Sequence, residues 1–355
     1  MKREKSLYYK ITDFSNLLLA SRKAQKGKRF KKNVLKFNHH LENELIGIRD
    51  SLISHTYRPG PYHVFKIYDP KERLISAAAY RDRVVHHALC NVIEPVFEKT
   101  FIFDSYANRT GKGTHRAINR FQEFAGKNRY VLKADIRKYF PSIDLEILKS
   151  LIRRKIACPD TLWLIYLIID NSNQQEGVYD VFPGDDLFTP CERRKGIPIG
   201  NLTSQFFANI YLNPLDHFIK EELKCRYYVR YVDDFAVFDN DKKYLHQIKE
   251  ETGAFLESLR LRLHENKTKV FRVETGIGFL GHMIFPDFRL LKKENLKRFR
   301  RRLKRQVRMY ESGMLSLEKL RQSLQSWNAH ASYSDTYRLR KEIFDNLALQ
   351  GISLI

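Results

Sequence analysis

Cysteine is scarce in this sequence, and the cysteines it has are widely separated. Cys90, Cys158, Cys191 and Cys225 never come close enough to form a C-x-x-C pair. Structural zinc sites and disulfide frameworks both need denser cysteine spacing than this. The pattern therefore favours neither, and we expect these residues to be buried free thiols.

A long apolar run is also lacking. The longest one, Leu162 to Ile169, is far shorter than the roughly 20 apolar residues of a membrane-spanning helix. The first ten residues include Lys2, Arg3, Lys5 and Lys10, and they have neither the apolar segment nor the cleavage site of a signal peptide. We therefore expect a cytoplasmic protein with no membrane partner, and a core helix at 162–169.

Acidic residues are the third shortage. The 355 residues include 64 Lys and Arg against 41 Asp and Glu, a formal net charge of +23. This surplus favours a polyanionic partner, with nucleic acid as the first candidate, because basic side chains neutralise phosphates and release counterions. The segment from Ser21 to Lys32 is rich in cations and poor in apolar residues, and it predicts a mobile basic arm.

The apolar periodicity predicts strands and helices that interleave up to Pro286, followed only by helices. Asp69-Pro-Lys-Glu72 has the composition of a hairpin turn, and Pro141 should end the element that begins at Tyr130. We expect helices at 41–53, 81–97, 114–124, 145–155, 162–169, 203–222, 243–259 and 292–310, and strands at 62–68, 73–77, 130–135, 227–232, 235–239, 269–273 and 278–285.

Tyr231-Val-Asp-Asp234 lies between two apolar strand patterns, so its two carboxylates should sit at a tight turn. Adjacent like charges repel, and a divalent cation would relieve that repulsion. Such a turn alone is usually just solvated. A third acid, Asp135, ends another expected strand. Three carboxylates on adjoining strand ends can hold two Mg²⁺ ions, which prefer oxygen ligands.

At this point the sequence resembles the reverse transcriptases, over roughly residues 60 to 290. Asp135 to Phe140 is similar to the first acidic motif of the family, and Tyr231 to Asp234 to its acidic turn. Gly196 to Gln205 resembles the second motif, Leu261 to Thr268 the lysine-bearing motif, and Gly278 to Gly281 the primer grip. Three upstream segments resemble the fingers motifs of bacterial, intron-type members: Arg73 to Ser76, Tyr80 to Arg83 and Ser105 to Arg109.

The resemblance implies an α+β fold of the right-hand polymerase type, with fingers, a palm built on an antiparallel sheet, and a helical thumb. The expected boundaries are a basic N-terminal region at 1–60, fingers at 61–130, a palm at 131–285 that includes part of the fingers at about 145–195, and a thumb at 286–355. The implied activity is RNA-directed DNA synthesis, in which dNTPs extend a DNA or RNA primer on a template RNA to give cDNA.

The resemblance also implies roles for single residues. Asp135 and Asp233 would bridge two Mg²⁺ ions, with the carbonyl of Ile136 completing one site and Asp234 helping electrostatically. Lys267 would protonate the pyrophosphate, although Lys269 is an alternative that the sequence does not separate from it. Phe140 would exclude a ribose 2′-hydroxyl. The other expected nucleotide contacts are Lys71, Arg73, Ile199, Gly200 and Gln205, and the expected template or primer contacts are Arg81, Arg83, Arg109, Phe279, Leu280 and Gly281.

The second motif departs from the Gln-Gly-x-x-x-Ser-Pro form, because Ile199 replaces the Gln and Gln205 replaces the Pro. This variant, and the segment from Gln322 to Asp335, resemble the reverse transcriptases of diversity-generating retroelements. That likeness implies errors at adenines during mutagenic retrohoming and an accessory variability determinant, a small basic oligomer. An apolar Ile offers a physical reason for loose base selection, since apolar contacts discriminate less than hydrogen bonds.

Two other interpretations stay open. One is a reverse transcriptase of group II intron or phage-defence type, although no maturase segment or nuclease signature follows in the sequence. The other is a catalytically silent RNA-binding scaffold, against which the intact Asp135, Asp233 and Asp234 argue. The ten Lys and Arg between Lys292 and Arg308 fit either a solvated helix face or, in a polymerase, a helix that tracks the duplex backbone.

Overall fold

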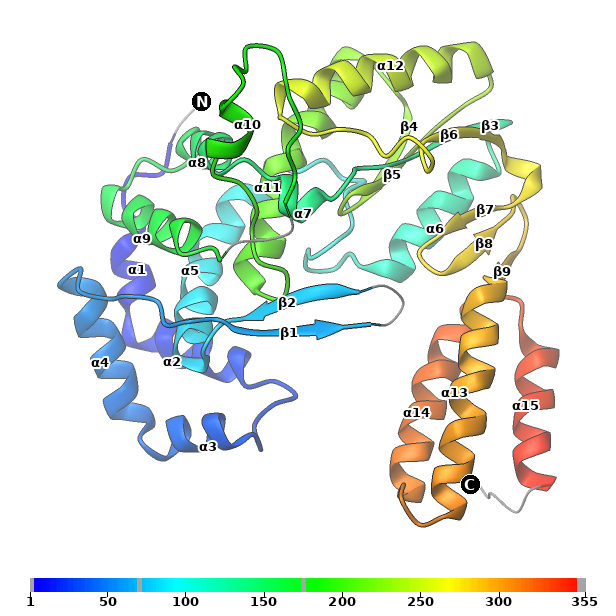
Figure 1. Cartoon of the computed structure of the whole chain (residues 1–355), viewed down its shortest axis with the longest axis horizontal. Helices are drawn as coiled ribbons and strands as arrows, with labels where there is room; N and C mark the ends of the chain where they lie inside the picture. The colour runs from blue at the N-terminus through cyan, green and yellow to red at the C-terminus, as the bar shows by residue number, and fades with distance from the viewer. Residues whose placement is uncertain (1–2, 69–71, 174–176, 350–355) are drawn as a thin grey trace.

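The computed structural model describes residues 3–68, 72–173 and 177–349. Helices of the N-terminal part lie on one side, a central sheet with its helices occupies the middle, and a C-terminal helical bundle stands apart at the other end (Figure 1). The fold combines helices with antiparallel sheets, as expected for the α+β class. None of the helices within the described ranges has the length and apolarity that crossing a membrane requires.

The N-terminal helices gather around α5 (Tyr80–Glu98). Helix α2 makes the broadest contact with α5, α1 and α3 make smaller ones, and α4 packs on α2. The expected mobile arm at 21–32 is wrong in its first part, because Ser21 and Ala24 are buried at the end of α2. The apolar side of α2 rests on α5, and its cations Arg22 and Lys23 are exposed, although the Lys23 ammonium donates to the Asn91 Oδ1 of α5 at 2.6 Å. These helices are α1 (Tyr8–Thr12), α2 (Phe14–Ala24), α3 (Lys32–His39) and α4 (Leu41–Ile53).

The central sheet has the antiparallel order β4-β5-β3-β6. Its strands are β3 (Tyr130–Asp135), β4 (Tyr227–Tyr231), β5 (Asp234–Asp239) and β6 (Lys269–Arg272). Alternate residues of β5 face opposite sides, as the pleat requires. Phe235 and Val237 join the main core with α11 (Leu202–His217) and α12 (Lys242–Ser258), whereas Phe238 joins a second core with α6 (Thr114–Ala125).

A smaller sheet follows, in the order β7-β8-β9. The single strand expected at 278–285 is instead a hairpin, because Leu280 and Gly281 adopt positive φ angles of 44° and 91° and turn the chain. A strand also lies beyond Pro286, where only helices were expected. The strands are β7 (Ile277–Phe279), β8 (His282–Ile284) and β9 (Arg289–Leu291).

Two further expectations need correction. β3 ends at Asp135, well before Pro141, which lies inside the short helix α7 (Tyr139–Ser142). Cys191 is exposed, while the other cysteines are buried free thiols as expected. The other elements are the hairpin strands β1 (His63–Ile67) and β2 (Arg73–Ala77), the helices α8 (Leu145–Arg153), α9 (Pro159–Asp170) and α10 (Thr189–Glu192), the π-helix η1 (Phe218–Glu222) that continues α11, and the 3-10 helix η2 (Val273–Thr275).

The C-terminal bundle has its own core. It consists of α13 (Lys293–Glu311), α14 (Leu317–Ala331) and α15 (Tyr337–Leu349), and its centre is the stacked pair Phe299 and Trp327, whose ring centroids are 4.0 Å apart. Asp335 ties the bundle to β9, since its backbone N–H donates to the Arg289 carbonyl at 2.9 Å. The cations of α13 therefore remain on the faces that the bundle does not bury.

Truncating Phe121 tests the core between α6 and the two sheets. Its buried ring contacts Phe238 and Phe279 at centroid distances of 4.8 and 4.5 Å. We expect Phe121→Ala to lower the free energy of unfolding by about 3–5 kcal/mol, because it leaves a cavity. Urea denaturation followed by circular dichroism measures this, and Phe103→Ala, at a ring that is 69% exposed, is the control. Similar losses in both variants would contradict this assignment of the core.

Candidate active site

Two strand ends bring the acidic residues together. β3 and β5 pair so that Asp135 lies opposite Asp234, and the Ile136 N–H donates to the Asp233 carbonyl at 3.3 Å. Asp233 belongs to the turn between β4 and β5, in which Val232 has a φ of 58°. The three acids that the sequence singled out thus share one end of the central sheet.

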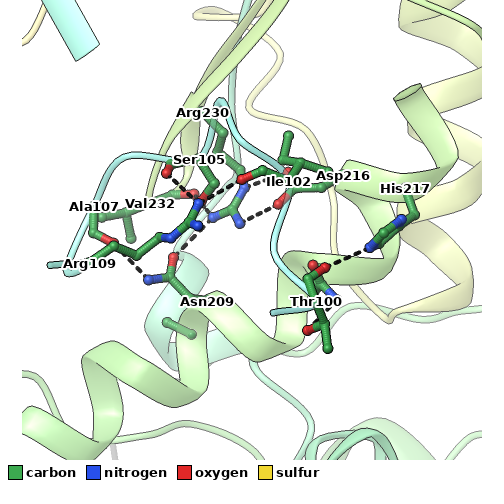
Figure 2. A network of polar contacts seen from close by, with 12 residues as sticks. Thr100, Ile102, Ser105, Ala107, Arg109, Asn209, Asp216, His217, Arg230 and Val232 are labelled. Atoms are coloured by element: carbon green, nitrogen blue, oxygen red, sulfur yellow. Dashed lines mark hydrogen bonds and ion pairs between the residues drawn. The ribbon is translucent and has the colours of Figure 1, made fainter. Parts of the chain in front are cut away.

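A buried ion pair lies directly behind this turn (Figure 2). Arg230 of β4 and Asp216 of α11 are each 0% exposed, with a bond of 2.7 Å from Nε to Oδ1 and one of 2.5 Å from Nη2 to Oδ2. The Arg230 Nη1 also donates to the Val232 carbonyl at 3.0 Å and to the Asn209 Oδ1 at 3.2 Å. Sequence reasoning missed Arg230, Asp216 and Asn209.

The carboxylates of the turn repel one another and are poorly solvated. Burial, reinforced by the charge of Asp135, raises the pKa of Asp233 to about 6. Burial also raises the pKa of Asp234, and the neighbouring Lys133 opposes that rise. The ionised form of these carboxylates is therefore disfavoured, and a neighbouring positive charge would stabilise it.

Two lysines provide part of this positive charge. The Lys133 Nζ lies 3.1 Å from the Asp234 Oδ1, and the Lys267 Nζ lies 2.7 Å from the Asp135 Oδ1. Lys267 was expected at the site, whereas Lys133 was missed. The sequence signal for Lys133 was its position two residues before Asp135, because residues 133 and 135 of one strand point to the same face.

The acids fit a hard divalent cation in donor type, since carboxylate oxygens are the ligands that Mg²⁺ prefers. As the side chains lie, no group of three or more His, Cys, Asp or Glu among the described residues forms a ready-made metal cluster. Lys267 is bonded to Asp135 in that arrangement, so metal binding there requires its flexible side chain to move. The burial of two carboxylates in mutual repulsion is the observation that favours a cation at this position.

The β1–β2 hairpin is joined to the second motif. The Ser76 N–H donates to the Ile199 carbonyl at 3.0 Å, and the buried Asn201 side chain bonds the backbone of both Ser76 and Ala78. Gly200 has a φ of 116°, and a Cβ there would lie 2.9 Å from the Ile75 side chain. Only glycine suits this crowded position.

The expected nucleotide contacts have mixed surroundings. Arg73 is exposed at the start of β2, and Gln205 is exposed near the start of α11. Phe140 is half-buried just beyond the strand end of Asp135, and Ile136 is fully buried. Lys71 lies outside the described residues.

The side chains of Arg109 and Phe279, two expected template or primer contacts, are engaged inside the protein. Every nitrogen of the Arg109 guanidinium bonds inside the protein, to Glu98 and to the carbonyls of Ile102 and Ser105. Figure 2 shows Arg109 with Ile102 and Ser105. Phe279 is 0% exposed and stacks on Phe121. Both side chains therefore support the scaffold, and the template or primer contacts expected of these two residues stay predictions.

The remaining template and primer candidates differ in exposure and in the hydrogen bonds that they already make. Arg81 is exposed on α5, whereas the Arg83 Nε donates to the Ala78 carbonyl at 2.8 Å. Leu280 and Gly281 form the β7–β8 turn, where the Gly281 carbonyl accepts from Asn295 at 3.1 Å. This bond connects the turn to α13, so the C-terminal bundle and the predicted primer grip are in direct contact.

Comparisons with known proteins bear on the family of the chain. The family model described as reverse transcriptase (RNA-dependent DNA polymerase) matches residues 68–284, more than half of the chain. Protein YkfC of Escherichia coli (strain K12) is 28% identical over 285 residues, covering 68% of this chain and 71% of that protein. Group II intron-encoded protein LtrA of Lactococcus lactis subsp. cremoris is 23% identical over 324 residues, covering 72% of this chain and 51% of that protein. The chain thus spans about half the length of LtrA.

Replacing Asp233 tests the electrostatics of the turn. Its pKa is raised from 3.8 to about 6, so the ionised carboxylate destabilises the folded state above that pH, and protonation relieves this as the pH falls. We expect Asp233→Asn to raise the free energy of unfolding by about 1–3 kcal/mol at pH 7.5 without divalent ions, and the gain to shrink toward pH 4. Calorimetry measures it, with Asp287→Asn as an exposed control. A gain independent of pH would contradict the assignment.

Proposed function

The chain belongs to the reverse transcriptase (RNA-dependent DNA polymerase) family, and on that premise we propose that Asp135, Asp233 and Asp234 are its catalytic acids. Family membership makes it an RNA-directed DNA polymerase, a nucleotidyltransferase whose substrates are template RNA, primer and dNTPs. The observation that carries the proposal is the pairing of β3 with β5, which sets Asp135 opposite Asp234.

We assign the polymerase parts to the elements of the fold. The β1–β2 hairpin and α5 belong to the fingers, the central sheet is the core of the palm, and α13, α14 and α15 form the thumb. Helices α1 to α4 lie in the basic N-terminal region at 1–60. The hairpin extends from the N-terminal side toward the side on which the bundle lies (Figure 1).

Reverse transcriptases generally use Mg²⁺, and Asp135, Asp233 and the Ile136 carbonyl are the groups we propose to hold two ions. Bound there, the ions would activate the primer hydroxyl and stabilise the charge of the leaving pyrophosphate. Lys267 is the better candidate for the pyrophosphate proton donor, because its ammonium reaches Asp135. Lys269 is exposed on the edge strand β6, opposite Lys133.

The cationic surface of α13 suits the backbone of a duplex. Arg298, Arg301, Arg302 and Arg305 line a cavity of about 650 Å³ beside Trp327. Phosphate contacts of this kind hold a duplex without reading its sequence. The segment 22–36 provides another basic surface, with no Asp or Glu in it, and within the described ranges none of its cations forms an ion pair. It suits a structured template RNA or an accessory protein with acidic patches.

We further propose that the enzyme copies its template with errors at adenines, as part of a diversity-generating retroelement. The support is the Ile199 to Gln205 motif, whose backbone is bonded to the fingers hairpin. An accessory variability determinant belongs to this proposal. A group II intron-like or phage-defence enzyme is the second candidate, which the 23% identity to LtrA favours.

The first test is Mg²⁺-dependent dNTP incorporation on an RNA template. Replacing both acids of the turn, Asp233→Asn with Asp234→Asn, should reduce extension to background, because the metal ligands are lost, while RNA binding in a filter assay persists. Asp287→Asn is the control at an exposed acid. Extension that survives in the double variant would eliminate the proposed site, and a wild type with no extension under any condition would favour a scaffold.

The deoxynucleotide preference should depend on Phe140. Its half-buried ring lies close behind the strand end of Asp135, so a smaller side chain would make room for a 2′-hydroxyl. We expect Phe140→Ala to reduce the preference for dNTP over NTP, measured as a ratio of kcat/KM values, by roughly 10-fold or more. Phe288→Ala, at an exposed ring, should leave the ratio unchanged. An unaltered ratio in Phe140→Ala would mean that another residue excludes the 2′-hydroxyl.

Fidelity at adenine should depend on Ile199. A hydrogen-bonding side chain there would discriminate bases more strongly than the apolar Ile. Sequencing of the cDNA should therefore show fewer errors opposite adenine in Ile199→Gln than in wild type, with errors at other bases little changed. Faithful copying by the wild type would instead favour the intron or defence interpretation, and an unchanged adenine error rate in Ile199→Gln would remove Ile199 from the explanation.

A further inference from the structure

We infer that Arg230 is a positioning residue of the polymerase reaction, whose guanidinium holds the left-handed turn at Val232 and so aims Asp233 at the metal-binding position. The inference rests on the proposed function of the acids. The Arg230 side chain would not touch the substrates, yet its contacts would fix the direction in which the acids point.

The turn needs an external support because its own sequence does not favour it. Val232 has a φ of 58°, a conformation that β-branched residues strongly avoid and that Gly or Asn adopts more easily. The next two residues are carboxylates, which repel each other at close range. Strain of this kind persists only where surrounding contacts compensate for it, and it is frequent at active sites.

Arg230 provides that contact. Its Nη1 donates to the Val232 carbonyl at 3.0 Å, two residues along the chain, while Nε and Nη2 grip the Asp216 carboxylate. Tyr228 donates its hydroxyl to the same carboxylate at 2.8 Å. Arg230, Asp216 and Tyr228 are all 0% exposed, so water cannot readily replace the bond to Val232.

The arginine is itself held from a second side, by its own backbone and by Asn209. The Arg230 N–H donates to the Asp104 carbonyl and the Tyr106 N–H donates to the Arg230 carbonyl, both at 3.0 Å. Asn209 links Arg230 to the same loop, because its Nδ2 donates to the Ala107 carbonyl at 2.8 Å (Figure 2). The positions of α11 and of the 104–107 loop therefore fix the position of the Arg230 guanidinium, which in turn fixes the Val232 carbonyl.

Stability alone does not account for this arrangement. A buried ion pair contributes little net stability compared with apolar residues of similar size. An apolar pair could fill the space but could not donate to the Val232 carbonyl. Lysine keeps the charge, yet its single ammonium cannot bind a carboxylate through two parallel bonds and reach a carbonyl with the same fixed geometry.

The test compares Arg230→Lys with Arg193→Lys. The control changes another buried arginine, which pairs with Asp185 and lies outside the proposed site. Purified full-length variants would be assayed for kcat, for the KM of dNTP, and for Mn²⁺ affinity by electron paramagnetic resonance of the free ion. Mn²⁺ binding reports on the acids without requiring catalysis.

We expect Arg230→Lys to lower kcat by about 10-fold or more and to weaken Mn²⁺ binding by about 10-fold, as loss of a group that orients metal ligands does. The KM of dNTP should stay within about twofold, since the nucleotide contacts are untouched. Adding Val232→Gly should restore part of both losses, because Gly adopts a positive φ without a brace. Arg193→Lys should change neither kcat nor Mn²⁺ affinity.

Unchanged kcat and Mn²⁺ affinity in Arg230→Lys, or losses of the same size in Arg193→Lys, would overturn the inference, as would a complete failure of Val232→Gly to restore either quantity. If Arg230→Lys does not fold, Asn209→Ala is the second variant, which removes the 3.2 Å bond to the Arg230 Nη1 together with the 2.8 Å bond to the Ala107 carbonyl. It should shift both quantities in the same direction by a smaller factor, and no shift would overturn the inference. A wild type that binds Mn²⁺ but never extends a primer would refute the proposed function alone, because the Mn²⁺ affinities still test Arg230.

Discussion

The register between β3 and β5 is the constraint on which the site depends. Pairing Asp135 with Asp234 brings acids from distant parts of the sequence to one strand end and one face. A slip of one residue would turn the Asp135 side chain to the opposite face of the sheet. The alternating burial of β5 prevents that slip, because Phe235 and Val237 fill one core and Phe238 fills the other.

Charge balance links the acids to their surroundings. Asp233 and Asp234 are held in an environment that raises their pKa values, and Lys133 and Lys267 partly offset the repulsion. Such an arrangement stores unfavourable electrostatic energy that a divalent cation can release. The basic surfaces on α13 and at 22–36 lie on other parts of the molecule, so the chain combines an anionic centre with cationic surroundings suited to a polyanion.

The scaffold behind the site is polar as well as apolar. The pair of Arg230 and Asp216 crosses from β4 to α11, and Arg109 fastens the loop that covers the outer edge of β4. Asn201 likewise joins the β1–β2 hairpin to the start of α11. Helix α11 thus contacts the proposed fingers at its N-terminal end and, through Arg230, the acidic turn toward its C-terminal end, which gives these two regions a common support.

Local pattern in the sequence determined much of this protein. Strand alternation around Tyr231-Val-Asp-Asp234 predicted the hairpin, the strand before Asp135 predicted the third acid, and helix bounds such as 41–53 agree with α4. Tertiary structure alone decided that Arg109 and Phe279 support the scaffold, that Leu280 and Gly281 divide an expected strand, and that Arg230 braces the turn. Periodicity reports which face of an element is buried, whereas the partners of a polar or aromatic side chain come from segments that only folding brings within reach.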